Sequence, residues 1–372
     1  MSRLHSPETM PLRVLHLIPS LGGGGAERQV SLLTRELALR GCEVHLGFVG
    51  GGTHLAGLES SAVTLHRISA RGNHDPRLGL RLIRLVRTLR PQLVQTWLPQ
   101  MDVLGGLAAR IAGTPWILCE REQGGGPKPG QWKRRLRRVL GRGASVIVAN
   151  SPAGAAYWRV EGKEAFIVPN AVPLAQIERA APIETDFAGA QILLFAGRLA
   201  PEKNVEHLVE ALAPIIRTRN AVALLVGDGP LAPALRARVA AMGLSERIRF
   251  PGFRDEIWSY MKRADVLVAP SRYEGHPNSV LEAAACACPL VVSDIPAHRA
   301  FLDESCAAFA PLDDPQRLAS AIMQVLDDRS AALARAAEAQ ARVHRRTVEQ
   351  LGADYLGIYR KVIATHSARF PR

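Results

Sequence analysis

Short apolar runs alternate with amphipathic segments along most of the chain. Residues 13–19 form a β-favouring apolar run, a glycine cluster follows at 22–25, and residues 26–41 carry apolar side chains at helical spacing. A second apolar run covers residues 43–49. This order of strand, glycine turn, helix and strand predicts a βαβ unit with parallel strands, because parallel neighbours need a crossover connection.

The same alternation continues through the first half and restarts in the second. Between the halves, residues 173–189 show no periodicity and contain two prolines, which predicts a linker. We therefore expect an α/β protein with two doubly wound, Rossmann-like parallel-sheet domains that face one another across a cleft. The predicted domains are residues 1–180 and 181–346, with a C-terminal helix in 347–372 that packs back on the first domain.

The pattern predicts further helices at residues 78–89, 103–111, 133–140, 204 onward, 231–242, 256–263 and 279–287.

Composition narrows the class of protein. Of 372 residues, 47% are hydrophobic and 22% charged, which excludes disorder for most of the chain. No apolar run is long enough to span a membrane and we see no signal peptide, so we expect a cytoplasmic protein. Five cysteines occur, and the close pair Cys286 and Cys288 lacks zinc-ligand spacing. Reduced, buried thiols and no metal site are expected.

The net charge of +13 is concentrated in the first half. Residues 1–180 contain 24 Lys and Arg against 12 Asp and Glu, whereas residues 181–372 contain 23 against 22. Such asymmetry favours a nucleic acid, an anionic membrane or an acidic substrate as a partner. Two predicted helices carry much of the excess: residues 78–89, and residues 133–140 with Lys133 at their start.

The densest chemical signal is SRYEGHPNSVLEA at residues 271–283. A loop with Gly275 and Pro277 leads into a predicted helix, whose N-terminus suits a phosphate group. Glu282 lies one turn into that helix, where its carboxylate can accept hydrogen bonds from a ribose, and Glu274 on the loop can accept them from a sugar ring. This spacing alone is also common on solvated helix faces.

Three further motifs follow predicted strands. Residues 195–211, FAGRLAPEKNVEHLVEA, place Arg198 and Lys203 before a helix, which suits a diphosphate leaving group. Residues 226–230, VGDGP, form a tight turn, and residues 20–27, SLGGGGAE, allow a close approach of backbone to a phosphate or sugar.

Taken together and in this order, the motifs resemble the retaining glycosyltransferases of family 4, which have the GT-B fold. The segments VANSPAG at 148–154 and VPNAV at 168–172 match as well, and the resemblance covers about residues 12–364. It implies a metal-independent hexosyltransferase without a cofactor. The co-substrate is a nucleotide-diphosphate sugar, with a UDP-sugar favoured.

The resemblance also implies roles for individual residues. Arg198, Lys203 and Glu274 are the implied catalytic group, with the two cations on the leaving diphosphate and Glu274 on the transferred sugar. Glu282 would hold the ribose, and Phe253 and Arg254 would border the base. The remaining implied donor-binding residues are Gly23, Gly24, Gly197, Gly275, His276, Pro277, Asn278, Ser279 and Val280.

The acceptor side departs from the family pattern. Many relatives have a histidine after the strand predicted at 92–97, whereas this chain reads TWLPQMD and offers only Gln100 or Asp102. The basic first half and the resemblance together favour a glycan or lipid-linked acceptor in cell-envelope or exopolysaccharide synthesis. We expect a peripheral position on the inner face of the cytoplasmic membrane.

Two other classes remain open from the residues. A basic nucleic-acid-binding protein would explain the charge, but no RNP, KH or zinc signature occurs and aromatic residues make up only 5%, so we expect no nucleic-acid partner. A nucleotide-sugar epimerase or a phosphorylase of the same fold is the other alternative. No phosphorylase cofactor lysine site is found, and an epimerase has no evident need of a basic acceptor side.

Overall fold

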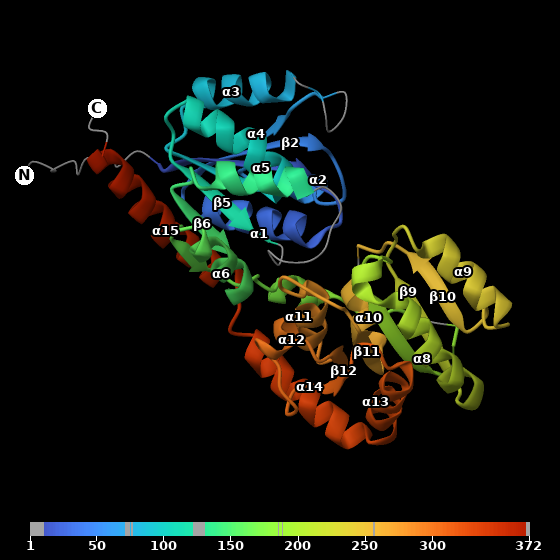
Figure 1. Ribbon diagram of the computed structural model, residues 1–372. Coiled ribbons are helices and arrows are strands. Elements are labelled where there is room, and N and C mark those ends of the chain that lie inside the picture. Colours follow the sequence, from blue (N-terminus) through green and yellow to red (C-terminus); the bar gives the residue numbers. More distant parts are fainter. Residues whose placement is uncertain are drawn as a thin grey trace, which may run out of the picture. The chain divides into compact units, whose positions relative to one another are not determined.

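The computed structural model describes residues 11–70, 75, 77–121, 131–184, 186–187, 189–255 and 257–369. The chain forms two compact units, coloured along the sequence in Figure 1. The first contains Met1–Ala171 and Val348–Arg372, and the second contains Val172–Thr347. Residues 172–180, which the sequence analysis assigned to the first domain, therefore belong to the second unit.

The first unit is built on a parallel sheet with the spatial order β3-β2-β1-β4-β5-β6-β7. Its described strands are β1 (Arg13–Ser20), β2 (Glu43–Gly50), β3 (Thr64–Arg67), β4 (Leu93–Trp97), β5 (Trp116–Glu120), β6 (Val146–Ala149) and β7 (Ala165–Ile167). Its described helices are α1 (Gly25–Leu39), α2 (Leu55–Glu59), α3 (Arg77–Leu89), α4 (Leu98–Ile111), α5 (Gln131–Gly141), α6 (Pro152–Val160) and α15 (Val348–Arg369).

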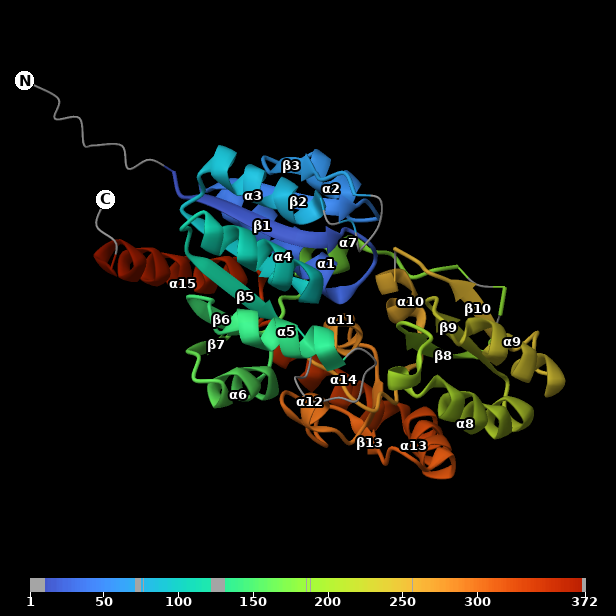
Figure 2. The same cartoon turned by 45° about the horizontal axis from the view of Figure 1, so that its top comes forward.

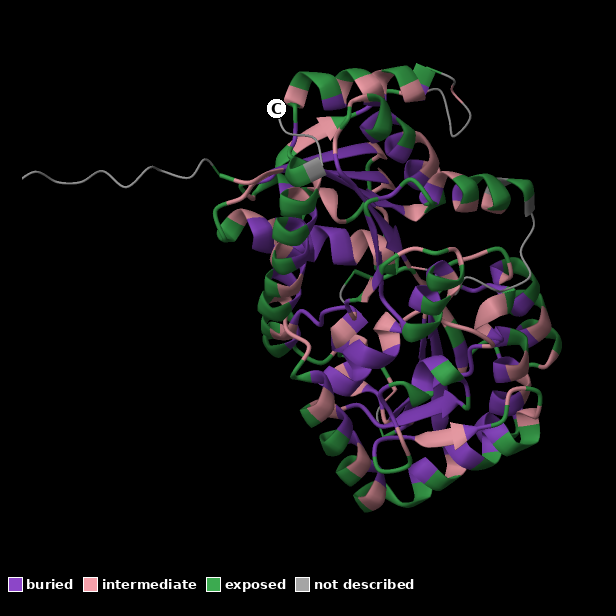
Figure 3. Cartoon of the chain, turned by 60° about the vertical axis from the view of Figure 1, so that its left-hand side comes forward, coloured by how far each residue is buried: buried purple, intermediate pink, exposed green. Residues whose placement is uncertain are grey.

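Alternate residues of β1 point to opposite faces of this sheet, as the period of a strand requires. Val14 and Ile18 pack in one apolar cluster with side chains of α1 and α15. Leu15 and Leu17 pack in another with α3, α4 and α6. Figure 3 shows the result: buried strands lie between helices whose outer faces are exposed. The C-terminal helix α15 is thus part of the core of the first unit.

The second unit repeats this plan, with the parallel order β10-β9-β8-β11-β12-β13. The strands are β8 (Gln191–Ala196), β9 (Ala221–Val226), β10 (Ile248–Gly252), β11 (Val266–Ala269), β12 (Leu290–Ser293) and β13 (Ala308–Ala310). The described helices are α7 (Leu174–Arg179), the 3₁₀ turn η1 (Pro201–Lys203), α8 (Val205–Thr218), α9 (Ala232–Ala241), α10 (Ile257–Arg263), α11 (Asn278–Ala285), α12 (Pro296–Arg299), α13 (Pro315–Asp327) and α14 (Arg329–Val343).

Side chains of strand β8 pack on both faces of this second sheet. Leu193 and Phe195 pack with α8, α9 and α13, whereas Ile192 and Leu194 pack with α7, α10, α11 and α14. Each sheet is therefore buried on both sides, which explains why the strands read as continuous apolar runs in the sequence.

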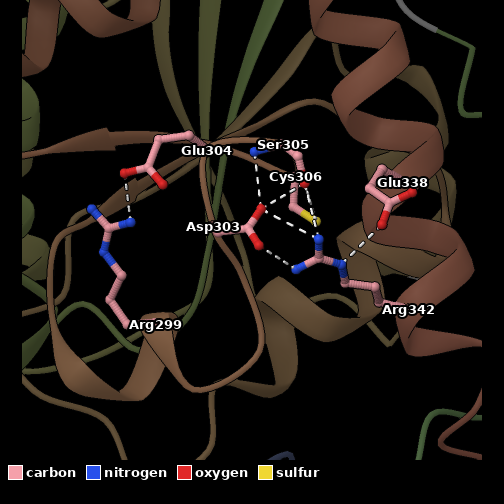
Figure 4. A network of polar contacts seen from close by, with 7 residues as sticks. All are labelled: Arg299, Asp303, Glu304, Ser305, Cys306, Glu338 and Arg342. Atoms are coloured by element: carbon pink, nitrogen blue, oxygen red, sulfur yellow. Dashed lines mark hydrogen bonds and ion pairs between the residues drawn. The ribbon is translucent and has the colours of Figure 1, made fainter.

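Charged side chains tie the segment after α12 to α14 (Figure 4). Arg342 of α14 donates to Asp303 at 2.9 Å and to Glu338 at 3.0 Å. Arg299, the last residue of α12, donates to Glu304 at 2.7 Å. Hydrogen bonds from Ser305 and Arg342 lower the pKa of Asp303 to about 2, so this carboxylate is charged at neutral pH. Arg299 thus links α12 to the segment that follows it, and Arg342 links that segment to α14.

Several elements differ from the sequence-based expectation. Helix α7 lies inside the segment expected to be an irregular linker, because Ile177 packs in the apolar cluster of the second unit. Helix α4 begins at Leu98 rather than at residue 103, with Pro99 in its first turn. Strand β3 and helix α6 were not predicted. The start expected at residue 256 for α10 lies outside the described residues.

Candidate functional site

The strand order of the second unit marks where a ligand is expected. β8 and β11 are adjacent and parallel, with Leu193 opposite Val266, yet the chain continues from them toward opposite sides of the sheet. In open α/β sheets, ligands bind beyond the carboxyl ends of the strands at such a switch point. The residues that follow β8 and β11 here belong to the two densest motifs of the sequence.

The loop after β8 is held by the turn VGDGP after β9. Gly227 has φ +138°, and a Cβ at this position would lie 1.9 Å from the carbonyl oxygen of Gly197. Leu199 N–H donates to the Asp228 carbonyl at 2.9 Å. Gly227 N–H donates to Gly252 O at 2.9 Å, which attaches the end of β10 to the same turn. The glycines of this motif therefore serve close backbone packing between three strand ends.

The two cations of this loop, Arg198 and Lys203, lie in different environments. Arg198 is 64% exposed and pairs with Glu202. Lys203 is 20% exposed and donates from Nζ to Glu274 Oε1 at 2.5 Å. Ser271 Oγ donates to the same carboxylate oxygen at 2.7 Å. The structure thus places Lys203 and Glu274, 71 residues apart in the chain, in direct contact at the switch point.

Helix α11 starts immediately after the Glu274 loop, at Asn278. Its N-terminus brings the positive end of the helix to the same edge of the sheet. Within it, Val280 contributes no exposed side chain: it is fully buried in the apolar cluster, and its N–H donates to Pro277 O at 3.1 Å. Val280 was predicted among the donor contacts, but its side chain packs in the core.

Glu282 lies on α11, and Phe253 and Arg254 directly follow β10. Glu282 is 3% exposed and its Oε2 accepts a hydrogen bond from Trp258 Nε1 at 2.9 Å. Phe253 is 41% exposed just after β10, and Arg254 Nε donates to Tyr260 Oη at 3.3 Å. Glu282 is therefore a fixed carboxylate, whereas Phe253 presents an open aromatic face.

Three residues around this site were not predicted from the sequence. Ser293, at the end of β12, donates from Oγ to Ser271 O at 2.6 Å. His298 of α12 lies 2.8 Å from Ser293 O through Nδ1. Arg346 Nη1 donates to His276 Nε2 at 2.8 Å. None of these residues stands in a glycine-rich or charged motif, and the strand-end position of Ser293 was the one usable signal.

The predicted residues Gly23 and Gly24 belong to the first unit, in the loop between β1 and α1. Gly24 caps α1, and the Glu27 carboxylate folds back so closely that a Cβ on Gly24 would lie 2.3 Å from its Oε2. Ser20 Oγ donates to Glu27 Oε1 at 3.3 Å. Burial raises the pKa of Glu27. These residues lie at the carboxyl end of β1, beside the switch between β1 and β4.

Asp102 does not have the environment expected of an acceptor-side catalytic residue. It is 1% exposed, and its two oxygens accept from Thr96 Oγ1 and Arg137 Nε, each at 2.7 Å. Arg137 also donates to the buried Glu120 at 2.7 Å. Asp102 is therefore part of a buried ion cluster. The suggestion from the sequence that Asp102, like Gln100, could substitute for the missing histidine is wrong for Asp102. Within the described residues, no group of His, Cys, Asp and Glu is arranged to hold a metal ion.

Comparison with known proteins identifies the class. Two doubly wound parallel-sheet units, with an ion pair and a helix N-terminus at one switch point, have the architecture of the GT-B fold. HepE (Alr3699) of Anabaena, solved with UDP-glucose, matches with a TM-score of 0.81 at 21% identity, over 92% of this chain and 99% of that one. The sucrose-phosphate synthase of Thermosynechococcus elongatus also matches with a TM-score of 0.81, at 20% identity over 95% of this chain and 100% of the other.

The family follows from sequence matches. Residues 190–328 match the family described as Glycosyl transferases group 1, and residues 23–176 match Glycosyltransferase Family 4. The 2-deoxystreptamine N-acetyl-D-glucosaminyltransferase of Streptomyces fradiae is 30% identical over 317 residues, which cover 72% of this chain and 74% of that protein. The chain belongs to the group 1 glycosyltransferases, as the motifs indicated.

A further relative carries information on acceptors. The UDP-Gal:alpha-D-GlcNAc-diphosphoundecaprenol alpha-1,3-galactosyltransferase of Escherichia coli is 27% identical over 279 residues, covering 68% of this chain and 71% of that protein.

Proposed function

We propose that this glycosyltransferase moves a sugar, with retention, from a UDP-sugar to a lipid-linked or other glycan acceptor in cell-envelope or exopolysaccharide synthesis. The observation that carries the proposal is the contact of Lys203 with Glu274 at the switch point of the second unit. The name of the Escherichia coli relative, with its UDP-galactose donor and polyprenyl-diphosphate acceptor, supports the choice of substrates. Retention rests on the resemblance to family 4.

The contacts leave each group free for its role. Lys203 has three N–H donors and gives one to Glu274, so two remain for the oxygens of a diphosphate. Both contacts of Glu274, from Lys203 and Ser271, go to Oε1, so Oε2 is available to a sugar hydroxyl. Arg198, largely exposed on the same loop, adds a second cation. The N-terminus of α11 favours negative charge at this edge.

These groups match the charge that develops in the reaction. The bond between the anomeric carbon and the diphosphate oxygen breaks, and the electron pair leaves with the diphosphate. The oxygen of the acceptor hydroxyl bonds to the anomeric carbon on the face from which the diphosphate departs, and the hydroxyl proton passes to the departing diphosphate oxygen. Arg198 and Lys203 stabilise the charge on the leaving diphosphate, Glu274 holds the sugar, and Glu282 the ribose. Phe253 and Arg254 border the base.

A nucleotide-release assay tests this proposal. We expect the purified protein to release nucleotide from at least one member of a panel of UDP-, GDP-, ADP- and dTDP-sugars, most rapidly from a UDP-sugar. Lys203→Gln should lower the rate by roughly 10²-fold or more, because it removes charge stabilisation in the transition state. Arg217→Gln, on the exposed last turn of α8, is the matched control and should leave the rate unchanged. Full activity in a folded Lys203→Gln variant would remove the assignment.

We also propose that the reaction needs no divalent metal. Arg198, Lys203 and the start of α11 supply positive charge where a metal would otherwise neutralise the diphosphate. We expect the rate to be the same in EDTA and in added manganese or magnesium. Loss of activity in EDTA that manganese restores would show that a metal carries the charge.

We further propose that the first unit binds an anionic membrane surface through α3, α4 and α5. These helices lie side by side (Figure 1, Figure 2). On α5, Trp132, Leu136 and Val139 are 67%, 39% and 51% exposed and form one stripe at helical spacing. The side chain of Lys133 lies outside the described residues. Arg137, expected in this basic surface, points inward to Asp102 and Glu120 and is not part of it. No helix in the described chain is long and apolar enough to cross a bilayer.

A further inference from the structure

His298 is a buried histidine beside the proposed sugar site. It lies on α12, is 0% exposed, and its Nδ1 is 2.8 Å from Ser293 O. A carbonyl oxygen only accepts, so Nδ1 carries the proton of the neutral ring. Ser293 Oγ in turn donates to Ser271 O, and Ser271 donates to Glu274. The ring is therefore fixed to the same short network that holds Glu274.

The second ring nitrogen has no partner. Nε2 of His298 is buried and makes no hydrogen bond within the described structure. In the neutral ring with a proton on Nδ1, Nε2 is an acceptor. Buried polar atoms in native proteins nearly always have a partner, and each exception calls for an explanation. A ligand group or a water molecule that donates a hydrogen bond would satisfy this nitrogen.

The surroundings restrict which ligand group that is. Glu274 and Lys203 are the charged side chains that act on the ring electrostatically, and burial lowers the pKa of His298, which keeps the ring neutral. Diphosphate oxygens are acceptors and cannot pair with an acceptor nitrogen. The ribose and base are assigned to Glu282 and the end of β10. The hydroxyls of the transferred sugar, next to Glu274, remain as donors.

We propose that His298 Nε2 accepts a hydrogen bond from a hydroxyl of the transferred sugar, which makes His298 a sugar-recognition residue. The inference rests on the proposed function of the Glu274 site. Because the ring is closed off in the structure described, the contact forms as the Glu274 loop rearranges around the sugar. A hydroxyl that donates to Nε2 and a second one that donates to Glu274 Oε2 would together select the configuration of the sugar.

Two variants separate this role from a purely structural one. In His298→Asn, the side-chain amide N–H takes the place of Nδ1–H and keeps the contact with Ser293, while the Nε2 acceptor is lost. In His298→Gln, the longer side chain brings its amide oxygen to the position of Nε2, while the donor to Ser293 is lost. A structural role predicts that Asn is tolerated and Gln is not.

We expect the opposite ranking in the KM for the donor, with His298→Asn impaired and His298→Gln tolerated. With the UDP-sugar found in the nucleotide-release panel, His298→Asn should raise KM roughly 10-fold, because one hydrogen bond to the sugar is lost. Its affinity for UDP, which has no sugar, should stay within about 2-fold, as should that of His298→Gln. His298→Gln should keep KM near that of the unaltered protein. An unchanged KM in a folded His298→Asn variant, or an equal loss of UDP and UDP-sugar binding, would overturn the proposal.

Monodeoxy donor analogues distinguish a sugar hydroxyl from a bound water. In the unaltered protein, removal of the contacted hydroxyl should raise KM roughly as much as His298→Asn does, and in His298→Asn the same removal should have no further effect. If every deoxy donor loses the same factor in both proteins, Nε2 contacts water and the proposal fails. If the unaltered protein neither binds UDP nor releases nucleotide from any donor, the function of the site fails instead.

Discussion

Glu282 illustrates why the choice of substitution matters at the scale of a single residue. Its carboxylate accepts from Trp258 Nε1 at 2.9 Å and is almost fully buried. Glu282→Ala leaves this indole N–H without an acceptor and should destabilise the second unit by about 1–3 kcal/mol. Glu282→Gln keeps an oxygen for Trp258. It replaces the second carboxylate oxygen, which a ribose diol would use, by a donor.

We therefore expect Glu282→Gln to keep the thermal midpoint while UDP affinity falls roughly 10-fold or more. Titration with UDP and thermal unfolding of both variants test this. If Glu282→Gln binds UDP as tightly as the unaltered protein, the ribose role of Glu282 is wrong.

His16 gives a prediction about acid stability. It is fully buried in the first unit, its Nδ1 accepts from Trp97 Nε1 at 3.1 Å, and burial lowers its pKa to about 3. Because the unfolded chain binds this proton near pH 6.5, stability is full above that pH and falls as the pH drops toward 3. At pH 4.5 the loss amounts to about 2–3 kcal/mol.

His16→Asn removes this titration and keeps an acceptor for Trp97, because the Asn side-chain oxygen reaches the position of Nδ1. We expect the loss of unfolding free energy between pH 7.5 and pH 4.5 to be about 2–3 kcal/mol smaller in this variant, as measured by urea unfolding. Tryptophan fluorescence suits the measurement, because four of the five tryptophans lie in the first unit and Trp258 lies in the second. His344→Gln, exposed at the end of α14, should leave the pH dependence as it is.

At the scale of elements, α5 combines an exposed basic face with one buried arginine. Arg137 contacts Asp102 and Glu120, each fully buried, at 2.7 Å. Arg137→Met leaves two uncompensated carboxylates in the core, so we expect a loss of about 3–5 kcal/mol in the unfolding free energy of the first unit. Arg135→Met, on the exposed side of the same helix, should change it by less than about 0.5 kcal/mol. Equal effects of the two substitutions would show that the ion cluster contributes nothing.

The same helix shows what the sequence was able to predict. The strands that precede and follow it could be predicted from their apolar runs, because a parallel sheet buried on both faces needs such runs. The position of the helix between them could be predicted as well. The direction of Arg137 could not, because Asp102 and Glu120 lie 35 and 17 residues away and meet it only after the chain folds. Helix α7 was missed for a similar reason: its stability comes from packing of Ile177, not from local periodicity.

The residues of the candidate site also separate into those that the sequence predicts and those that it does not. Lys203, Glu274 and Glu282 were predicted because they stand in motifs with glycine, proline and a helix start. His298 and Arg346 were not, since neither stands in such a motif. His298 contacts Ser293, five residues earlier, and Arg346 contacts His276, 70 residues earlier.

At the scale of the whole molecule, the charge separates by unit more sharply than by halves of the sequence. The first unit contains 27 Lys and Arg against 13 Asp and Glu, a net charge of +14, and the second contains 20 against 21, a net charge of −1. Helix α15 adds to the positive unit although it ends the chain. Any electrostatic attraction to an anionic surface therefore acts on the first unit.

This separation leads to a prediction for vesicle binding. Each basic residue near an anionic surface contributes about 1 kcal/mol, and an exposed tryptophan adds apolar contact at the interface. We expect the protein to sediment with vesicles of phosphatidylcholine and phosphatidylglycerol at low salt, to be released at high salt, and not to sediment with phosphatidylcholine alone. Trp132→Ser and Arg135→Gln should each weaken sedimentation several-fold without changing nucleotide release from a soluble donor. Leu333→Ser, 46% exposed on α14 of the second unit, is the matched control and should bind vesicles like the unaltered protein. Equal sedimentation with both vesicle types, or an equal effect of Leu333→Ser and Trp132→Ser, would contradict the assignment of α5 to the membrane surface.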